Sequence, residues 1–376
     1  MSRSTESDLN PDELRHYSRQ IAMPQFGEEG QKKLKHAKIA VIGAGGLGAP
    51  VLQYLAAAGV GTIGIFDFDV VEESNLHRQV LFNRGDIGKP KAKVAADRLK
   101  KLNPHINIIA HQALITPENV IKQLEPYGLA VDGSDNFLTR YIINDACLIL
   151  DIPLVYGSIY RFEGQCTVFN YVGNNGMRGP NLYGLYPEMP EEGFIPDCNT
   201  AGVLGVLPGV IGSIQATEAI KIATGIGEVL SGNLLLMSLL NNDTKIIRFS
   251  PSGKNKDIDR QAVLNRLKRY RENHGPVAQI SAGELSGLKE NSGKITLVDV
   301  RSKEEHEWFN IGGLLIPLEQ LEEKSSLLPK DKKIVMYCET GRRSTLAIRK
   351  LNKLYNDLDL YNLTGGLASW AGEKSL

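Results

Sequence analysis

The first 250 residues alternate between short apolar runs and amphipathic stretches, which predicts strands and helices in turn. Residues 38–42 are a β-branched apolar run typical of a buried strand, and residues 49–58 form a helical pattern that Gly59 ends. A second apolar run at 62–66 completes a strand–helix–strand unit. Further strands are expected at 106–110, 129–131, 154–156 and 165–171, with helical segments between most of them. This alternation predicts an α/β fold with a mostly parallel sheet and helices on both of its faces.

The regular pattern stops at residues 172–199, where Gly, Pro, Asn and Glu dominate. A loop of this length inside a compact domain is usually a functional lid or a disordered segment. Order returns with an apolar-periodic helix at 209–224. Residues 233–239 and 245–249 are then expected to form a hairpin that ends the domain.

A polar stretch at residues 250–276 has Pro and Gly near both ends and separates two α/β patterns. Its middle, residues 259–271, has the composition of a charged helix. After it, strands are expected at 295–300 and 333–337 and a helix at 345–354. We therefore expect a large domain at residues 8–250, a linker at 251–276 and a smaller α/β domain at 277–376.

Charge and cysteine content limit the kinds of partner and compartment. The chain has 43 Lys+Arg and 43 Asp+Glu, a balance that argues against nucleic acid or a membrane surface as a partner. The four cysteines, Cys147, Cys166, Cys198 and Cys338, are widely spaced and form no C-x-x-C pair. This spacing indicates no disulfide framework and favours a reducing cytoplasm. Since no signal-like segment and no run of about 20 apolar residues is present, neither export nor a membrane span is expected.

Glycines and one acid mark the ends of the first two expected strands. Gly43-x-Gly45-x-x-Gly48 joins the first strand to its helix, and Asp67 follows the second strand. Glycines at such a turn let backbone N–H groups approach phosphate, and an acid at this spacing suits ribose hydroxyls. Taken alone, the motif is most typical of NAD- or FAD-binding folds.

Three further charged residues narrow the choice of ligand. Arg78, Lys91 and Asp135 lie in segments that converge on the same edge of the expected sheet. Two cations beside a glycine turn suit a triphosphate, and an acid among them suits Mg²⁺. A dehydrogenase needs groups that orient a nicotinamide, and the sequence offers no evident group of that kind. The residues therefore favour a nucleoside triphosphate.

Six short motifs follow one another along residues 8–250: Arg15–Ile21, Gly43–Gly48, Asp67–Asp69, Asn75–Gln79, Gly88–Lys91 and Ser134–Asn136. In this order they resemble the E1-like adenylating enzymes, most closely the molybdopterin-synthase adenylyltransferase and ThiF type. The resemblance implies a Rossmann-like domain that uses ATP and Mg²⁺ to adenylate the C-terminal Gly-Gly carboxylate of a ubiquitin-like sulfur carrier.

The same resemblance implies roles for individual residues. The implied ATP contacts are Gly43, Gly45, Gly46, Asp67, Asn75, Arg78, Lys91, Asp135 and Asn136. Within this set Asp135 would hold Mg²⁺, while Arg78 and Lys91 would act on the triphosphate in catalysis. Arg19 would reach the phosphates in the partner subunit's site, which implies a homodimer.

Cys198 follows the long loop, and several members of the resembled family have a reactive cysteine there that links covalently to the carrier. Cys198 is therefore a candidate catalytic residue, the alternative being an ordinary buried cysteine. Cys147 and Cys166 lie in helical and strand patterns and are expected in the core. Many relatives hold a structural zinc with two C-x-x-C pairs. Neither pair is present at 181–184 or 250–256, so no zinc site is expected.

Cys338 ends the run at 333–337 and opens a turn into a helix, Glu339, Thr340, Gly341, Arg342, Arg343 and Ser344. Backbone N–H groups in such a turn and the helix N-terminus favour a negatively charged sulfur. A C-x5-R phosphatase loop is the main competitor, but Arg343 falls one position short of that pattern.

Further motifs accompany this turn: Asp299–Arg301, Glu304–His306, Ile311–Pro317 and Gly365–Trp370. Together they resemble a rhodanese domain over roughly residues 277–373. The resemblance implies that Cys338 carries a persulfide and that residues 339–344 surround it. Phe309-Asn310 stands where the family often has a Gly-His pair.

Together the two resemblances imply an enzyme that activates a sulfur carrier. The first domain would make the carrier acyl-adenylate, and the second would deliver sulfur from Cys338 to give a thiocarboxylate. The expected sulfur donor is thiosulfate or a cysteine desulfurase. The alternatives are a nicotinamide-dependent oxidoreductase with a sulfur-handling tail and a non-catalytic scaffold that binds the carrier. Molybdopterin, thiamine, cysteine and tRNA thiolation pathways use similar carriers, so the pathway stays open.

Overall fold

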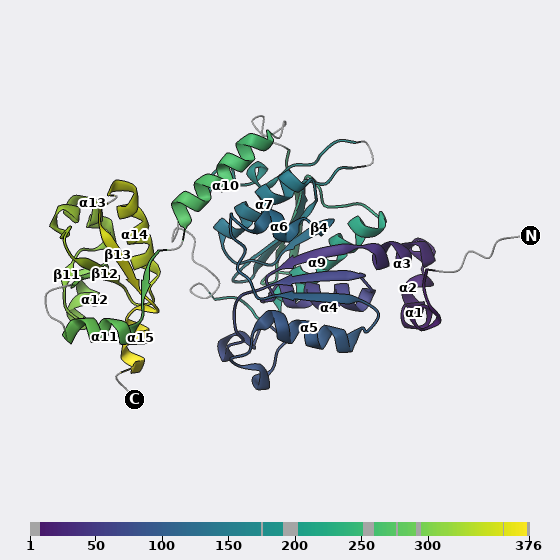
Figure 1. The fold of residues 1–376 in the computed structure, drawn as a ribbon. Coiled ribbons are helices and arrows are strands. Elements are labelled where there is room, and N and C mark those ends of the chain that lie inside the picture. Colours follow the sequence, from purple (N-terminus) through teal and green to yellow (C-terminus); the bar gives the residue numbers. More distant parts are fainter. Residues whose placement is uncertain are drawn as a thin grey trace, which may run out of the picture. The chain divides into compact units, whose positions relative to one another are not determined.

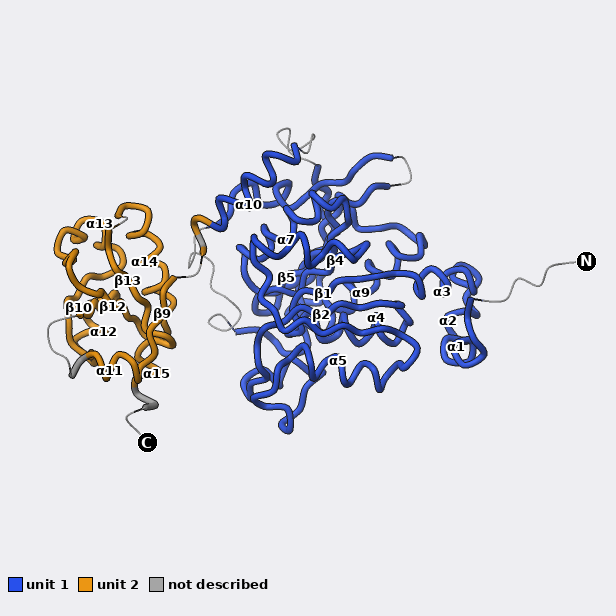
Figure 2. The backbone as a smooth tube through the Cα atoms, in the orientation of Figure 1, with its two compact units in different colours: residues 1–271 blue, residues 272–376 orange. Residues whose placement is uncertain are grey.

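The structure, a computed structural model, describes residues 8–173, 176–190, 202–250, 259–275, 277–290, 295–355 and 357–373. The chain divides into two compact units, residues 1–271 and residues 272–376 (Figures 1 and 2). In the described part of the chain, no helix has the combination of length and apolar composition that a membrane span requires.

The first unit is built on an eight-stranded sheet in the order β3-β2-β1-β4-β5-β6-β7-β8. Its strands are β1 (Lys38–Ile42), β2 (Thr62–Phe66), β3 (Asn107–His111), β4 (Leu129–Asp132), β5 (Leu154–Tyr160), β6 (Glu163–Phe169), β7 (Asn233–Ser238) and β8 (Asp243–Arg248). The pairs among β1 to β5 are parallel, and the pairs from β5 to β8 are antiparallel. The predicted sheet and its terminal hairpin are confirmed.

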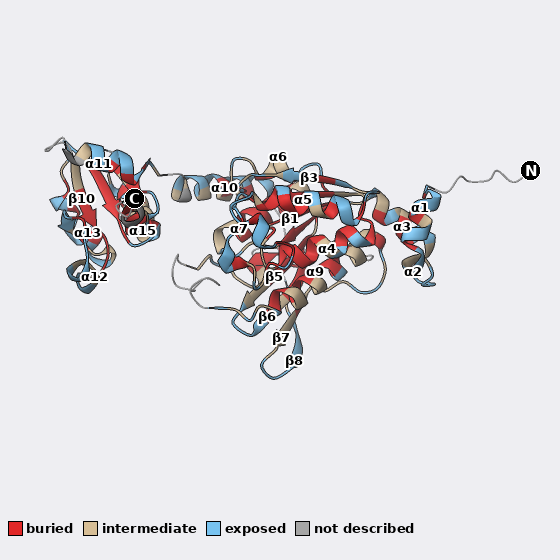
Figure 3. Cartoon of the chain, turned by 90° about the horizontal axis from the view of Figure 1, so that it is seen from below, coloured by how far each residue is buried: buried red, intermediate tan, exposed pale blue. Residues whose placement is uncertain are grey.

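The helices described in this unit are α1 (Pro11–His16), α2 (Ser18–Ile21), α3 (Gly27–His36), α4 (Gly48–Ala58), α5 (Lys91–Leu102), α6 (Val120–Leu124), α7 (Phe137–Leu150), α9 (Leu207–Thr224) and α10 (Arg260–His274), with 3-10 turns η1 (Glu73–Asn75), η2 (Arg84–Asp86) and η3 (Leu182–Gly184). Ile39 and Val41 of β1 belong to a core with α4, α5 and α9. Ala40 and Ile42 belong to a second core with α6, α7 and α10. Helices therefore cover both faces of the sheet, and the continuous apolar run of β1 reflects a strand buried on both sides (Figure 3).

Part of the stretch predicted as a loop, residues 172–199, is packed into the first unit. Leu182 and Tyr183 of η3 are buried. The Tyr183 hydroxyl lies 3.1 Å from both carboxylate oxygens of Asp145 on α7, and Arg266 of α10 donates to the same carboxylate at 3.1 Å. The expectation of a lid is wrong for this part, because its polar side chains form a buried network. Residues 191–199 lie outside the described residues.

The second unit holds a five-stranded parallel sheet in the order β11-β10-β12-β13-β9. Its elements are β9 (Gln279–Ile280), α11 (Ala282–Glu290), β10 (Ile295–Asp299), α12 (Lys303–Trp308), β11 (Leu314–Leu315), η5 (Leu318–Gln320), α13 (Leu321–Lys324), η6 (Ser325–Leu327), β12 (Lys333–Tyr337), α14 (Arg342–Leu354), β13 (Asp359–Leu363) and α15 (Gly366–Glu373). Ile334 and Met336 of β12 face one core, and Val335 and Tyr337 face the other. The strands and the helix predicted here are confirmed as β10, β12 and α14.

Helix α10 occupies much of the stretch expected to be a linker. Val263 and Leu267 on this helix are buried in the second core of the first unit. Residues 251–258 and 276 lie outside the described residues. The domain limits predicted from the sequence stay a prediction.

Candidate functional sites

Gly43 and Gly48 shape the turn that joins β1 to α4. Gly43 has a φ of +91°, and a Cβ on it would lie 2.7 Å from the carbonyl oxygen of Gly133. A Cβ on Gly48 would lie 1.8 Å from the carbonyl oxygen of Gly43. A larger residue therefore fits neither position without moving the backbone. The two glycines let the ends of β1 and β4 approach the start of α4, where helix N–H groups can face a ligand.

Asp67 ties the end of β2 to this turn. Its Oδ2 accepts a hydrogen bond from the Ala44 N–H (2.7 Å), and its Oδ1 accepts one from the Asp69 N–H (2.8 Å). Burial raises the pKa of the Asp67 carboxyl, while the Ala44 N–H and the charge of Lys91 partly oppose this. Each carboxylate oxygen has a further lone pair, so Asp67 can also accept from hydroxyl groups.

Two cations stand near this carboxylate. Lys91, the first residue of α5, is buried, and its Nζ donates to Asp69 Oδ2 at 3.1 Å. Arg78 is half-buried, and its Nη1 donates to the carbonyl oxygen of Ser74 at 3.1 Å and lies 2.9 Å from Nε2 of His77. Asp69 was not predicted as a site residue, although it closes the Asp-Phe-Asp motif. It holds the Lys91 amine in place.

Eight of the ten predicted ATP residues meet in one cleft at the carboxyl edge of the parallel strands. Those that line it are Gly43, Gly45, Gly46, Asp67, Arg78, Lys91, Asp135 and Asn136. Asn75 is buried and does not line this cleft, and Arg19 is exposed on α2, also outside it. The roles assigned to all these residues stay predictions.

Asp135 and Asn136 follow β4 and are both exposed. Asn136 caps α7, because its Oδ1 accepts the Thr139 N–H at 2.9 Å. Among the described residues, no group of three or more His, Cys, Asp or Glu side chains is placed to hold a metal ion. A single carboxylate such as Asp135 nevertheless fits Mg²⁺, which proteins bind with one or two carboxylates plus substrate phosphates and water.

Arg140, on the first turn of α7, lines the same cleft and was missed from the sequence. It is only 6% exposed and donates to the carbonyl oxygen of Ser134 and the hydroxyl of Tyr156, both at 3.2 Å. Its Nε lies 4.0 Å from Asp132 Oδ2, and neither atom has a hydrogen-bond partner. A buried guanidinium with an unmade bond can receive an anionic or carbonyl group of a ligand. The available signal was an arginine four residues, or about one helical turn, after the N-cap Asn136.

Gln79 is a second missed residue of the cleft. It is 4% exposed, and its Oε1 also lacks a hydrogen-bond partner. A Cβ on Gly45 would lie 3.5 Å from its Nε2, so the amide stands beside the glycine turn. The sequence motif contained Gln79, but nothing in the pattern distinguished it from a core residue.

In the second unit, Cys338 lies at the end of β12 and is 1% exposed. The Gly341 N–H lies 3.2 Å from its Sγ, and the Ser344 hydroxyl lies 3.5 Å from it. Gly341 has a φ of +85° and begins α14 as its N-cap. The turn therefore aims an N–H group, a hydroxyl and a helix N-terminus at the sulfur, and the role of residues 339–344 around a persulfide stays a prediction.

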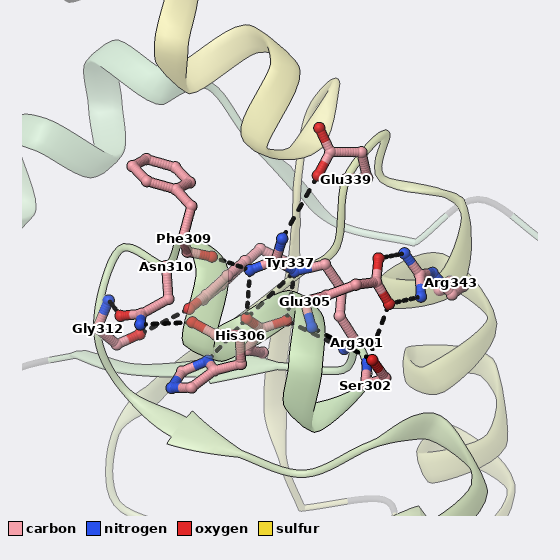
Figure 4. A network of polar contacts seen from close by, with 11 residues as sticks. Arg301, Ser302, Glu305, His306, Phe309, Asn310, Gly312, Tyr337, Glu339 and Arg343 are labelled. Carbon is pink, nitrogen blue, oxygen red and sulfur yellow. Dashed lines mark hydrogen bonds and ion pairs between the residues drawn. The ribbon is translucent and has the colours of Figure 1, made fainter.

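Arg343 of this turn is held by Glu305 of α12 (Figure 4). Its Nη1 and Nη2 donate to Oε2 and Oε1 at 2.7 and 2.6 Å. The hydrogen bond with Arg343 lowers the pKa of Glu305 to about 2. The pKa of Arg343 is raised by the same bond and, to a smaller extent, by Cys338. Glu305 lies within the motif Glu304–His306, and the sequence pattern alone does not predict it as a site residue.

Arg301 joins three segments around the turn (Figure 4). It is buried, and its Nη2 donates to Asp299 Oδ2 at 2.7 Å and to the carbonyl oxygen of Phe309 at 2.5 Å. Its Nη1 reaches Oε2 of Glu339 at 3.4 Å. Burial opposes ionisation of Asp299, yet hydrogen bonds from Arg301 and His306 leave the pKa of Asp299 lowered. The Arg301 side chain thus connects the sheet to the residue that follows Cys338.

Cys147 and Cys166 are fully buried, as expected, and burial raises the pKa of both thiols. Burial and a raised thiol pKa are typical of core cysteines and not of reactive ones. Cys198 lies outside the described residues, so its predicted role stays a prediction.

Sequence comparisons match both units to known families. The ThiF family matches residues 17–258, and the rhodanese-like domain matches residues 281–373. A relative from Mycobacterium tuberculosis, named probable adenylyltransferase/sulfurtransferase MoeZ, is 42% identical over 97% of this chain and 94% of its own length. The adenylyltransferase and sulfurtransferase MOCS3 of Aedes aegypti is 36% identical over 96% of this chain and 87% of its own.

Two other matches concern the first unit. The sulfur carrier protein adenylyltransferase of Thermus thermophilus is 52% identical over 61% of this chain and 84% of its own length. Among solved structures, E. coli MccB with ATP matches with a TM-score of 0.55 and 23% identity, covering 65% of this chain and 74% of that chain. At that identity the structural match supports the fold alone.

Proposed function

Since the chain belongs to the ThiF family and carries a rhodanese-like domain, we propose that it adenylates a ubiquitin-like sulfur carrier and then converts the activated carboxylate into a thiocarboxylate. The relatives named above are adenylyltransferases and sulfurtransferases, and none of them supports the alternatives of an oxidoreductase or a non-catalytic scaffold.

The observation that carries the first half is the common cleft of the glycine turn with Asp67, Arg78, Lys91 and Asp135. In the proposed step, the carrier carboxylate attacks the α-phosphorus of ATP, and pyrophosphate leaves. No general base is needed, because a carboxylate is already ionised at pH 7. Arg78 and Lys91 stabilise the charge on the departing pyrophosphate, and Asp67 binds the ribose. Bound Mg²⁺, held by Asp135 and the phosphates, would neutralise further charge on the triphosphate.

The second half uses Cys338. In its persulfide form, the outer sulfur attacks the acyl-adenylate and displaces AMP, which leaves the carrier joined to Cys338 through an acyl disulfide. A thiol then attacks Sγ of Cys338 in this acyl disulfide and forms a new disulfide with Cys338. The carrier leaves with the outer sulfur as its thiocarboxylate. The turn around Cys338 supports this role, since the Gly341 N–H and Ser344 hydroxyl are placed to stabilise an anionic sulfur. Cys198 remains a candidate for a covalent link to the carrier.

The proposal also covers subunit assembly, location and the sulfur donor. A homodimer would bring Arg19 of one subunit to the phosphates of the other, which agrees with the exposure of Arg19 outside its own cleft. A cytoplasmic location follows from the cysteine pattern. The sulfur donor is thiosulfate or a cysteine desulfurase.

The direct test is ATP–pyrophosphate exchange with purified protein. We expect exchange that depends on a carrier ending in Gly-Gly and stops when the carrier lacks its last glycine. Exchange without any carrier, or reduction of a nicotinamide in place of exchange, would refute the proposal.

A further inference from the structure

A buried ion pair at the end of β4 is incomplete. Asp132 is fully buried and Arg140 is 6% exposed, and the distance from Asp132 Oδ2 to Arg140 Nε is 4.0 Å. Neither atom has a hydrogen-bond partner among the described residues. Most buried polar atoms in proteins are hydrogen-bonded, because leaving one unpaired costs free energy. The packing of the unit alone does not explain this pair, which stands next to the cleft that Arg140 lines.

Asp132 is held by contacts that leave one of its oxygens unused. Its Oδ1 accepts from the Ser134 N–H at 2.8 Å and from the Ser134 hydroxyl at 2.6 Å. Its carbonyl oxygen accepts from Nε2 of Gln215 at 2.7 Å. Asp132 is not one of the residues that line the cleft, so its carboxylate acts on the cation beside it and not on a ligand. That negative charge compensates a guanidinium whose burial would otherwise be costly.

The other partners of Arg140 are neutral. Its Nη1 donates to the hydroxyls of Tyr156 at 3.2 Å and Ser158 at 3.0 Å, and its Nη2 donates to the carbonyl oxygen of Ser134 at 3.2 Å. The rings of Phe137 and Tyr156 have their centroids 5.3 and 5.2 Å from its Cζ. These contacts fix the plane of the guanidinium while its Nε–H stays available. A fixed guanidinium is the side chain best suited to hold a carboxylate.

The strand order places Arg140 away from the residues proposed to bind the nucleotide. Neighbouring strands follow the order β2-β1-β4-β5, in which Asp67 ends β2 and the glycine turn follows β1. Lys91 pairs with Asp69, also beyond β2, whereas Arg140 contacts Tyr156 and Ser158 of β5. A nucleotide with its ribose at Asp67 and its phosphates at the glycine turn therefore leaves the β4 and β5 side of the cleft for the second substrate.

From this arrangement we propose that Arg140 binds the carboxylate of the carrier's terminal glycine and that Asp132 is a positioning residue that acts through Arg140. The inference rests on the proposed adenylation and adds the residue that holds its second substrate. One carboxylate oxygen accepts from Arg140, and the other forms a bond to the α-phosphorus of ATP. The bond from this phosphorus to pyrophosphate breaks, and pyrophosphate leaves with the electron pair. Holding the carboxylate beside the phosphorus lowers the entropic cost of the reaction.

The test for Arg140 uses two forms of one carrier. The probe is a Gly-Gly-ended carrier that supports ATP–pyrophosphate exchange, prepared with its free carboxylate and as the C-terminal amide. Calorimetry measures the binding of both forms to the full chain with Mg²⁺ and α,β-methylene-ATP, from which pyrophosphate cannot leave. Arg140→Ala should reduce the preference for the carboxylate form roughly 10- to 150-fold, because a hydrogen bond to a charged group is lost. The affinity for α,β-methylene-ATP should stay nearly unchanged.

Arg269→Ala, at an exposed position of α10, is the matched control and should keep the full preference. Weaker nucleotide binding in Arg140→Ala with an unchanged carboxylate preference overturns the inference, since Arg140 then binds phosphate. If no Gly-Gly-ended carrier supports exchange with the unchanged protein, the proposed adenylation itself fails, and the inference fails with it.

Asp132 is tested by a double-mutant cycle on the same preference. Asp132→Asn keeps an oxygen for the Ser134 contacts and removes the charge, so it should reduce the carboxylate preference roughly 5-fold. In the Arg140→Ala background it should cause no further reduction, because Asp132 then has no guanidinium to position. Asp97→Asn, at an exposed position of α5, should change nothing.

Binding of α,β-methylene-ATP shows whether each Asp132 variant keeps its fold. If Asp132→Asn does not bind it, Asp132→Ser, a smaller neutral side chain, takes its place in the cycle. A positioning role is refuted if neither variant binds the nucleotide, since Asp132 is then required for the fold. It is refuted equally if the loss caused by Asp132→Asn is as large in the Arg140→Ala background as in the unchanged protein.

Discussion

Arg343 and Glu305 are joined by two parallel N–H···O hydrogen bonds of 2.6 and 2.7 Å, although 38 residues separate them along the chain. The pair links the first turn of α14 to α12, so it holds the turn after Cys338 against a second helix. Both residues also belong to the polar network around Arg301 (Figure 4).

The Arg343–Glu305 pair should make the second unit sensitive to acid. The pKa of Glu305 is lowered from 4.5 to about 2, so its stabilising contribution is complete above pH 4.5 and is lost as the pH falls to 2. Glu305→Gln should therefore lower the Tm of this unit by a few degrees at pH 6. A partly exposed pair contributes up to about 1 kcal/mol, which corresponds to about 4–8 °C in a unit of this size. The difference should shrink at pH 3.

Tryptophan fluorescence can follow this unit alone, because both tryptophans of the chain, Trp308 and Trp370, lie within it. Glu323→Gln serves as the control and should leave the Tm unchanged at both pH values. An equal loss of Tm at pH 6 and pH 3 would contradict the ionic origin of the effect.

Lys91 should matter for adenylation far more than its neighbour Lys93. The Lys91 amine is buried in the cleft beside Asp69, whereas Lys93 on the same helix is exposed. Losing a hydrogen bond from a charged group costs about 1.5–3 kcal/mol, so Lys91→Ala should slow carrier-dependent ATP–pyrophosphate exchange roughly 10- to 150-fold. Lys93→Ala should leave exchange unchanged. Equal rates for the two variants would remove Lys91 from the proposed site.

The sheet and the glycine turn could be predicted because their signals are local. The run 38–42 is apolar at every position but Lys38, and Gly43 and Gly48 stand where a Cβ would meet backbone. The strand ends then brought Asp67, Lys91 and Asp135 to one edge, as parallel topology requires. Strands β9 and β11 were missed because two residues are too few to show a period of two.

The missed site residues depend on contacts between distant segments. Asp69 gains its role only where its carboxylate meets the Lys91 amine, and Glu305 only where α12 meets Arg343. Arg140 looked like a polar residue of a helix, yet its guanidinium is buried against Tyr156 and Ser134. Composition also misled at Tyr183, because a stretch rich in Gly, Pro and Asn was expected to remain outside the core.

Arg266 should contribute strongly to the stability of the first unit. It binds the fully buried carboxylate of Asp145, which Tyr183 also contacts. Removing one partner of a buried ion pair leaves an uncompensated charge and costs about 3–5 kcal/mol. Because Arg266 is 23% exposed, we expect Arg266→Ala to lie near the lower end, about 3 kcal/mol, in denaturant unfolding followed by circular dichroism. Arg269→Ala, at an exposed position of α10, should cost less than about 0.5 kcal/mol.

The purified protein should contain no stoichiometric zinc. No cysteine is present at residues 181–184 or 250–256, where the family resemblance would place two ligand pairs, and residues 182–184 form η3, in which Tyr183 is buried. Elemental analysis of protein purified without chelators is the measurement. About one zinc per chain would show that other residues bind the metal.

The two chemistries should separate by mutation, because the cleft lies in the first unit and Cys338 in the second. Cys338→Ala should abolish thiocyanate formation and leave carrier adenylation nearly intact. Asp135→Ala should do the reverse, since its proposed role concerns the triphosphate.

Cys198→Ala distinguishes between a covalent link to the carrier and a core role. If Cys198 links to the carrier, thiocarboxylate formation should fall while exchange and thiocyanate formation survive, whereas a core role would lower stability and all three activities together. Loss of adenylation in Cys338→Ala at unchanged folding would show that the two units do not act independently.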